Sequence, residues 1–217
     1  MKKFSIKIKI SSLKYWEERA EQYGKRAVLN IGHSEAEIQA VTQMQKDVIF
    51  PILRQKLRGD EKIILDFGCG PGRFTGDLAN IIHGRAIGVD PIQCFLEMAP
   101  KNDNIEYRLM KGNNIPIDDA SVDIVWICLV LGGIVDANAL QSILLEIKRV
   151  LKDGGLIFLI ENTSKIKDGR YWKYRTPEDY EQYFSFANLR YLSDYFDLEE
   201  RISIMSGRKK EFNENSM

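Results

Sequence analysis

The chain has 217 residues, of which 44% are apolar, so it is long enough to bury one hydrophobic core and we expect a single domain. Its 31 basic and 31 acidic residues balance, which argues against a nucleic-acid or membrane-surface partner and favours a small-molecule ligand. Its three cysteines have neither the even count of a disulfide framework nor the spacing of a metal site, so no metal is expected.

The N-terminal segment begins with an ambiguous pattern and continues into a first helix. Residues 1–10 alternate polar and apolar side chains, which fits an edge strand and a loose arm equally well. The first residues, Met-Lys-Lys, could open a signal peptide, but two further lysines interrupt the apolar residues that such a peptide needs. No stretch of the chain is apolar enough to span a bilayer. We therefore expect a cytoplasmic protein. Ser11 and Ser12 are typical caps for a helix that Gly24 ends.

A second helix is expected to begin after Ser34, because Ser34 and Glu37 have the spacing of a capping box. Apolar residues continue at helical spacing as far as Leu57, and Pro51 should bend or split this helix. We expect residues 1–57 to form a helical lid on the rest of the domain.

Residues 58–208 have the pattern of an α/β core. Short apolar runs bounded by Gly, Pro and Asp alternate with helical patterns, as in a parallel sheet that is covered on both faces. The sequence KDGG, at residues 152–155, is expected to end the last of the intervening helices. Strands are expected at residues 62–67, 86–89, 105–110, 122–129 and 155–161, and helices at 73–82, 92–98 and 137–151.

The C-terminal part predicts a closing antiparallel hairpin. A helix follows Thr176, and two extended runs, at residues 189–196 and 201–207, are joined by the sequence DLEE. The basic run at residues 208–210 is expected to be solvated, with residues 209–217 forming a tail. The expected fold is therefore a Rossmann-like, doubly wound α/β sheet with a hairpin at one edge and an N-terminal helical lid.

The stretch ILDFGCGPGRF, residues 64–74, is the most specific motif of the chain. With the helix and strand that follow, it has the βαβ pattern of a nucleotide site, in which glycines let a ligand approach the backbone closely. Asp90, at the end of the second strand, has the position from which a carboxylate accepts both hydroxyls of a ribose.

Three features of this motif argue against a dinucleotide. The third glycine comes one residue early, so Arg73 stands where the dinucleotide pattern has glycine. Pro71 removes a backbone donor from the turn, and the carboxylate of Asp66 would repel a phosphate. An adenosine with a cationic tail suits these residues better. The sequence therefore predicts S-adenosylmethionine as cofactor, with its ribose at Asp90 and its ammonium near Asp66.

Four successive motifs resemble those of class I S-adenosylmethionine-dependent methyltransferases of the type 11 group. They are ILDFGCGPGRF, IGVDPIQCFLEMA, IPIDDASVDIVWICLVLGGIVD and EIKRVLKDGGLIFLIEN, and they cover roughly residues 60–161. The resemblance implies a seven-stranded sheet that ends in the antiparallel hairpin. It also implies cofactor contacts for Asp66, Gly68, Gly70, Gly72 and Asp90, with Pro91 and Ile92 against the adenine.

The loop after the third strand, MKGNNIP, departs from the family, which usually presents an aspartate to the adenine amino group there. Asn113 and Asn114 are both candidates, because an amide offers an acceptor and a donor to the adenine edge. Cys69 and Cys128 are expected near the cofactor, since they lie at the tips of neighbouring strands. A nucleophilic role is not expected for them, because only Arg73 could lower a thiol pKa there.

Aromatic residues after the fifth strand weakly indicate an acceptor site. Tyr171, Trp172 and Tyr174 lie where an acceptor would be walled, although packing of the last helix against the sheet is the better explanation for any individual ring. For Trp16 and Tyr23, a lid over the cofactor and plain helix packing are balanced alternatives.

The two histidines differ in their expected roles. His33 precedes the second helix, in a segment that commonly closes over such a site, and it is a weak candidate for a substrate contact. His83 lies away from the strand tips where ligands bind and is expected to be structural.

The expected function is methyl transfer from S-adenosylmethionine to a small acceptor of unknown identity. This in-line displacement depends mainly on alignment, and only a hydroxyl acceptor needs a base, so no catalytic residue is assigned. The alternative is a non-catalytic S-adenosylmethionine-binding or scaffold protein, because every residue singled out with some assurance contacts the cofactor. A nicotinamide-dependent oxidoreductase is a third hypothesis, disfavoured by Asp66, Pro71 and Arg73. The oligomeric state is left open.

Overall fold

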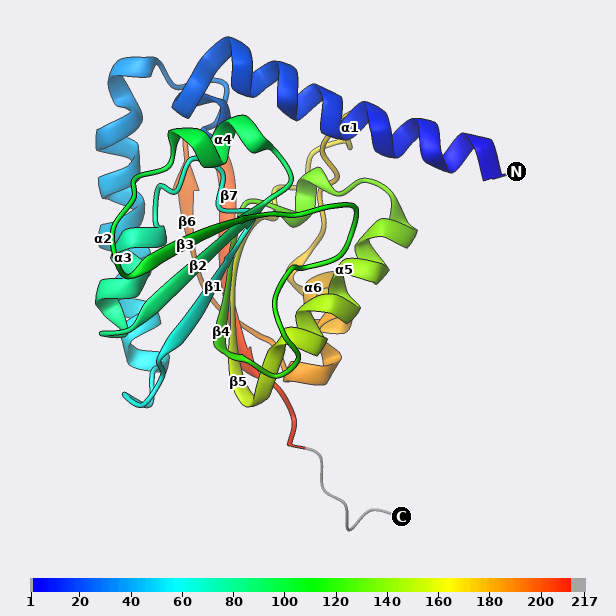
Figure 1. The fold of residues 1–217 in the computed structure, drawn as a ribbon. Coiled ribbons are helices and arrows are strands. Elements are labelled where there is room, and N and C mark those ends of the chain that lie inside the picture. The colour runs from blue at the N-terminus through cyan, green and yellow to red at the C-terminus, as the bar shows by residue number, and fades with distance from the viewer. Residues whose placement is uncertain (1, 212–217) are drawn as a thin grey trace.

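The computed structural model describes residues 2–211 and has a seven-stranded sheet at its centre (Figure 1). The strand order is β3-β2-β1-β4-β5-β7-β6, and β7 runs antiparallel to both of its neighbours while the other pairs are parallel. The predicted Rossmann-like fold with a closing hairpin is confirmed. The strands are β1 (Ile63–Phe67), β2 (Arg85–Asp90), β3 (Ile105–Leu109), β4 (Val122–Cys128), β5 (Leu151–Asn162), β6 (Arg190–Asp197) and β7 (Glu200–Arg208).

Helices cover both faces of this sheet, and one further helix crosses its upper end. Figure 1 shows α2 and α3 on one side of the sheet and α5 and α6 on the other, with α1 across the top. The α-helices are α1 (Lys2–Tyr23), α2 (Ile38–Lys56), α3 (Thr75–Ile81), α4 (Gln93–Met98), α5 (Ala137–Val150) and α6 (Pro177–Tyr183). Short 3₁₀ helices are η1 (Gly24–Val28), η2 (Glu35–Glu37), η3 (Leu131–Gly133) and η4 (Ser185–Ala187).

Two apolar clusters hold the layers together, one on each face of the sheet. Successive residues of β4 are buried in opposite clusters: Trp126 packs with α2 and α3, and Ile127 packs with α5 and α6. The Trp126 ring stacks on Phe158 of β5 with a centroid distance of 5.4 Å. Burial on both faces explains why the central strands are almost continuously apolar in sequence.

The N-terminal segment differs from the expectation for residues 1–10. Residues 2–10 belong to α1, and residue 1 lies outside the described residues. The two edges of the sheet are β3 and β6, so no strand from this segment pairs with it. Ser12 is not a cap, because its hydroxyl donates to the carbonyl oxygen of Gly133 at 3.2 Å. The predicted stop at Gly24 is confirmed, since α1 ends at Tyr23 and Gly24 has a φ of +54°.

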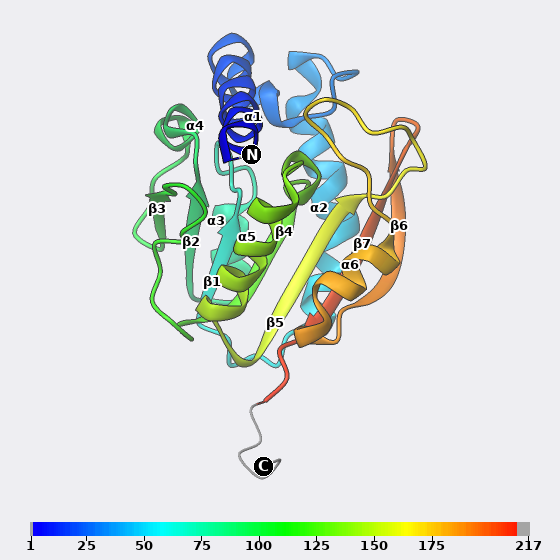
Figure 2. The same ribbon diagram turned by 90° about the vertical axis from the view of Figure 1, so that its right-hand side faces the viewer.

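The second helix follows the predicted capping box at Ser34 and Glu37, which is present. Pro51 does not split this helix, because α2 runs without interruption from Ile38 to Lys56. The apolar side of α2 packs against the sheet through Ile49 and Leu53, both fully buried. Figure 2 shows α2 along the flank of the sheet and α1 above it, so the roof of the molecule is formed by α1 and the segment that follows it.

The predicted helix end before KDGG is confirmed within one residue, since α5 ends at Val150. The strand begins earlier than predicted, because β5 starts at Leu151, and the pairing of β4 with β5 shifts register at this irregular start. Of the basic run that was expected to be solvated, only Lys210 is exposed. Arg208 donates to the carbonyl oxygens of Lys56 and Gly154, and Lys209 donates to that of Leu151 at 2.7 Å.

Within residues 2–211, none of the helices is both long and apolar enough to cross a bilayer. His83 is exposed in the turn after α3, away from the upper end of the sheet, with a φ of +48°. The backbone N–H of Gly84, next in the chain, donates to the carbonyl oxygen of Ala79 at 3.1 Å and closes this helix end. These contacts fit the structural role expected for His83.

Candidate active site

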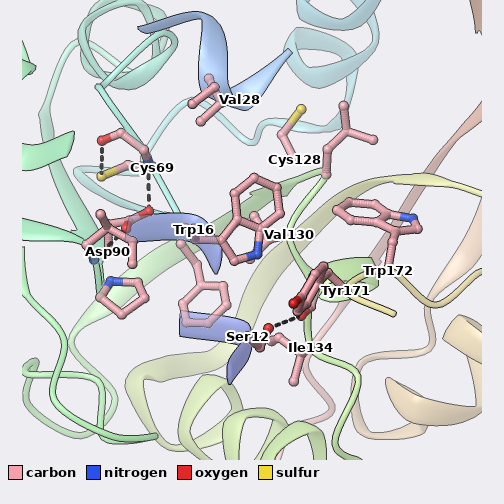
Figure 3. A pocket seen from close by; sticks show the side chains of 18 of the residues that line it. Ser12, Trp16, Val28, Cys69, Asp90, Cys128, Val130, Ile134, Tyr171 and Trp172 are labelled. Carbon is pink, nitrogen blue, oxygen red and sulfur yellow. Dashed lines mark hydrogen bonds between the residues drawn. The ribbon is translucent and has the colours of Figure 1, made fainter. Parts of the chain in front are cut away.

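A cavity of about 400 Å³ lies at the carboxyl ends of the parallel strands, beneath α1 and η1 (Figure 3). Its volume lies within the range of about 300–1,000 Å³ that is usual for small-molecule sites. In Figure 3, Asp90 and Cys69 lie on one side of the cavity and Trp172 on the other, with Trp16 of α1 between them. This is the edge of an open α/β sheet where ligands bind.

The glycine turn between β1 and α3 forms one wall of the cavity. Gly68, Gly70 and Gly72 have φ values of +70°, +52° and +71°, which other residues rarely adopt. A Cβ on Gly68 would lie 2.5 Å from the Val130 side chain, so the turn also needs glycine for space. Gly68 and Gly70 line the cavity, whereas Gly72 packs against Tyr107 and does not line it.

Asp90 ends β2 and fixes two backbone segments of the cavity. One carboxylate oxygen accepts the N–H of Gly70 and the other accepts the N–H of Ile92, both at 2.9 Å. Burial raises the pKa of Asp90 to about 6, although these two hydrogen bonds lower it. Because each carboxylate oxygen has two acceptor sites, each retains one for a hydroxyl of a ligand.

Asp66 ends β1 and is the second buried carboxylate of the cavity. Its oxygen accepts a hydrogen bond from the Thr75 hydroxyl at 2.6 Å. Burial raises the pKa of Asp66 to about 7, and the nearby carboxylate of Asp90 adds to this rise. A cationic group in the cavity would stabilise the ionised form of Asp66.

Arg73 also lines the cavity, and sequence reasoning did not identify it as a site residue. Its guanidinium donates to the Thr42 hydroxyl at 3.3 Å and to the amide oxygen of Gln45 at 2.7 Å. Within the described part of the chain, no carboxylate forms an ion pair with it. Burial lowers its pKa. A buried cation with only neutral partners is suited to an anionic group of a ligand.

The adenine side of the predicted site is partly assembled in the structure. Pro91, Ile92 and Asn113 line the cavity. Asn114 does not line it, because its backbone pairs with Lys111 in a tight turn. Of the two candidate amides, Asn113 is thus the one that reaches the cavity.

Cys69 and Cys128 both line the cavity, at the tips of β1 and β4. Burial raises the pKa of Cys69 well above its usual range and that of Cys128 to about 12. Both thiols are therefore protonated at neutral pH and are poor nucleophiles.

Aromatic side chains form the roof and the far wall. Trp16 lines the cavity, and Tyr15 beside it stacks on Tyr171 with a centroid distance of 4.1 Å. Tyr171, Trp172 and Tyr174 all line the cavity as well. Tyr23 does not line it, because its ring packs under the guanidinium groups of Arg19 and Arg26.

His33 does not line the cavity either, and it is buried behind a residue that does. Its Nε2 lies 2.5 Å from a carboxylate oxygen of Asp197, at the end of β6. Asp197 faces the cavity together with Glu200, the first residue of β7. No feature of the sequence indicates either carboxylate, because DLEE has the composition of an ordinary solvated turn.

Comparison with known proteins finds a family that resembles the middle of this chain. A family model described as "Methyltransferase domain" matches residues 65–159. Residues 65–159 are therefore similar to this methyltransferase domain family. The predicted resemblance to class I S-adenosylmethionine-dependent methyltransferases is confirmed, and the matched methyltransferase domain contains the glycine turn, Asp66, Asp90 and Cys128.

The curated relatives that match this chain include a C-methyltransferase and a ribosomal RNA-processing protein. The chain is 32% identical over 124 residues to the ubiquinone/menaquinone biosynthesis C-methyltransferase UbiE of Campylobacter jejuni, covering 52% of this chain and 49% of that protein. It is also 32% identical over 125 residues to ribosomal RNA-processing protein 8 of Rattus norvegicus, covering 57% of this chain and 23% of that protein. The chain thus spans less than half of the length of either relative.

Solved structures support the methyltransferase fold over almost the whole chain. Phosphoethanolamine N-methyltransferase 1 of Haemonchus contortus, in complex with phosphoethanolamine and S-adenosylhomocysteine, aligns with a TM-score of 0.68 and 18% identity. The alignment covers 97% of this chain and 51% of that one. At this identity the likeness establishes the fold alone. The roof, the aromatic wall and the Asp197–Glu200 end lie outside the residues that the family model matches.

Proposed function

We propose that the protein is a methyltransferase that transfers a methyl group from S-adenosylmethionine to a small-molecule acceptor. The observation that carries this proposal is the single cavity that joins the glycine turn and two buried carboxylates, Asp66 and Asp90, to a chamber with aromatic walls. One part of the cavity suits the cofactor and the other leaves room for an acceptor. A cytoplasmic location remains part of the proposal.

The residues present fit S-adenosylmethionine. Asp90 has an acceptor position free on each oxygen for the ribose hydroxyls, and Asp66 offers a carboxylate to the ammonium. Arg73 offers a guanidinium to the carboxylate of the methionine part, which sequence reasoning had not assigned. Pro91 and Ile92 present apolar surface to the adenine, and Asn113 presents an amide to its edge. When bound, the cofactor supplies an electrophilic methyl group on a sulfonium.

The contribution of the protein to this chemistry is mainly to align and enclose the reactants. The glycine turn is fixed by the N–H groups of Gly68 and Cys69, which donate to the carbonyl oxygen of Val89 at 2.8 and 3.1 Å. The α1 roof is fixed by the Ser12 hydrogen bond to Gly133 and by the stack of Tyr15 on Tyr171. A rigid, covered site holds two reactants in line and keeps water away from them.

A small acceptor is favoured because α1 lies over the cavity and restricts access to it. A macromolecule would have to reach the methyl group past Trp16 and past Tyr171, whose ring stacks on Tyr15. The formal net charge of +0 also provides no general attraction for RNA.

Calorimetry with S-adenosylhomocysteine and NAD in parallel tests the cofactor. We expect binding of the former and none of the latter; tight binding of NAD with no binding of S-adenosylhomocysteine would overturn the proposal. Mass spectrometry of small-molecule extract incubated with isotopically labelled methyl donor tests transfer. Cofactor binding without any labelled product, across extract and a broad acceptor panel, would instead identify a non-catalytic binding protein.

A further inference from the structure

The cavity continues past the part that the cofactor would occupy, toward the edge of the sheet that carries the hairpin. Asp90 is on β2 and Asp66 on β1, and the cavity then crosses β4 to Asn162 on β5, Glu200 on β7 and Asp197 on β6. Adjacent strands lie about 4.8 Å apart, so the Glu200 end is about 10 Å beyond β4. With the cofactor at β2, β1 and β4, this end is left for the acceptor.

Glu200 is held at this end by two amide side chains from different parts of the chain. The same carboxylate oxygen accepts a hydrogen bond from the amide of Asn30, at 2.9 Å, and from that of Asn162, at 2.7 Å. Tyr174 also lies close enough to Glu200 to lower the pKa of its carboxyl group. Among the described residues, no Lys or Arg forms an ion pair with it. The carboxylate is oriented, uncompensated by a cation and able to accept a further proton.

The hairpin places a second carboxylate directly opposite Glu200. Asp197 and Glu200 are paired across the two-residue turn, and like charges in such pairs destabilise a hairpin. The ring of His33 contacts Asp197, and the positive charge of Arg73, on the cofactor side, interacts electrostatically with Asp197. Burial raises the pKa of Glu200, and the charge of Asp197 raises it further. A like-charge pair that costs stability and faces a cavity is better explained by function than by folding.

Trp172 lines the same cavity. Its indole ring packs on Gly132, where a Cβ would collide with the ring. Its Nε1 is buried with no hydrogen-bond partner in the described part of the chain.

We propose that the acceptor group is a hydroxyl and that Glu200 is the general base that takes its proton, an inference that rests on the proposed methyltransferase function. An amine fits less well, because a carboxylate beside it would stabilise its protonated form, which has no electron pair for attack. A hydroxyl has the opposite requirement, since it becomes a good nucleophile only as a base removes its proton.

The proposed step balances without a further reactant. As the acceptor oxygen forms its bond to the methyl carbon, its proton moves to Glu200, whose carboxylate becomes neutral. The bond between the methyl carbon and sulfur breaks, and its electron pair stays on sulfur, so the sulfonium becomes a neutral thioether. Glu200 then returns the proton to solvent. Asn30 and Asn162 would position the base throughout, because they hold its other oxygen.

The test compares the full chain with the Glu200→Gln variant, using Glu199→Gln as control. Glu199 is exposed in the same turn, so the control makes the same change of charge outside the cavity. All three proteins receive S-adenosylmethionine with a carbon-13 methyl group, with cell extract and a panel of phenols, alcohols and amines as probes. Carbon NMR then identifies the atom that carries the transferred methyl group.

The expected product is a methyl ether, formed about 10² to 10⁴ times more slowly by Glu200→Gln. Both variants should keep wild-type affinity for S-adenosylhomocysteine, and the control should keep wild-type turnover. At saturating S-adenosylmethionine, the wild-type rate should rise with pH as Glu200 ionises, and the Glu200→Gln variant should lose this rise. A methyl group on nitrogen, carbon or sulfur, or an unchanged rate in Glu200→Gln, would overturn the inference. If the wild type bound no S-adenosylhomocysteine, or formed no product from any probe, the proposed function itself would be overturned.

Discussion

Replacing Asp90 by alanine should weaken cofactor binding strongly while the protein still folds. Hydrogen bonds to a charged group contribute about 1.5–3 kcal/mol each, so losing both ribose contacts costs about 3–6 kcal/mol. At about 1.4 kcal/mol for each factor of ten, the affinity for S-adenosylhomocysteine should fall by about 10² to 10⁴. The loss should be larger still if the glycine turn relaxes, because Asp90 also holds the N–H of Gly70.

Two opposing effects decide whether the Asp90→Ala variant folds. The buried N–H groups of Gly70 and Ile92 lose their acceptor, at a cost of about 1–3 kcal/mol each. Burial raises the pKa of Asp90 from 3.8 to about 6. The ionised side chain therefore costs the folded state about 3 kcal/mol at neutral pH, which alanine removes. The net loss is at most about 3 kcal/mol, against a usual total of about 5–15 kcal/mol.

Asp123→Ala is the matched control for this experiment. Its carboxylate also accepts two backbone N–H groups, those of Lys62 and Ile63, but at the opposite end of β1 and outside the cavity. Calorimetry and thermal unfolding should show a stability loss without an affinity loss for Asp123→Ala, and mainly an affinity loss for Asp90→Ala. A folded Asp90→Ala variant that binds S-adenosylhomocysteine within about tenfold of wild type would mean that the ribose lies elsewhere.

Three further predictions follow from buried groups. Burial raises the pKa of Asp66 to about 7, and the ligand ammonium group pairs only with the ionised carboxylate of Asp66. Affinity for S-adenosylhomocysteine should therefore rise by up to about tenfold per pH unit as the pH rises toward 7. A calorimetric affinity that does not change with pH would contradict this prediction. Gly72→Ala should lower the free energy of unfolding, measured with urea, by about 1–3 kcal/mol more than Gly24→Ala does. Both glycines have positive φ, but only at Gly72 would the added Cβ collide with Tyr107. Equal losses in the two variants would refute the collision. His33→Ala should lower the free energy of unfolding, measured with urea, by about 1–3 kcal/mol, because His33 contacts Asp197. It should leave the affinity for S-adenosylhomocysteine unchanged, because His33 does not line the cavity. Unchanged stability with a loss of affinity would mean that His33 contacts the ligand.

The residues on the proposed cofactor side of the cavity could be singled out because they are close together in sequence. The glycine turn, Asp66 and Asp90 come from one βαβ unit, and the positive φ values at Gly68, Gly70 and Gly72 leave a visible requirement for glycine. The strands were found for a similar reason, since burial on both faces requires runs of apolar residues. Arg73 was missed as a site residue because its sequence context is that of a solvated arginine. What distinguishes it is its pair of hydrogen bonds to Thr42 and Gln45 of α2, which is distant in sequence.

The ends of elements were predicted less well, because tertiary contacts override local preference. KDGG resembles a helix stop, yet it lies in β5, whose pairing with β4 determines the path of the chain. The basic run near the C-terminus resembles a solvated tail, but Arg208 reaches the carbonyl oxygen of Lys56 at 2.6 Å. Neither contact has a signature in the local sequence.

The proposed acceptor end could be predicted only in part, because it is assembled from four segments that are separate in the chain. Tyr174 was a weak candidate, whereas Asn30, Asn162 and Glu200 had no signal in the sequence. Asn30 follows the roof helix, Asn162 ends β5, Tyr174 is in the loop after it, and Glu200 begins β7. Within its own segment, each of these residues resembles an ordinary loop or surface residue. Glu200 lies beside Asn162 only because β7 pairs antiparallel between β5 and β6. The hairpin thus completes the sheet and also places a carboxylate facing the cavity. Acceptor chemistry can therefore change at this edge without altering the cofactor site on β1 and β2, since the two ends share no hydrogen bond among the described residues.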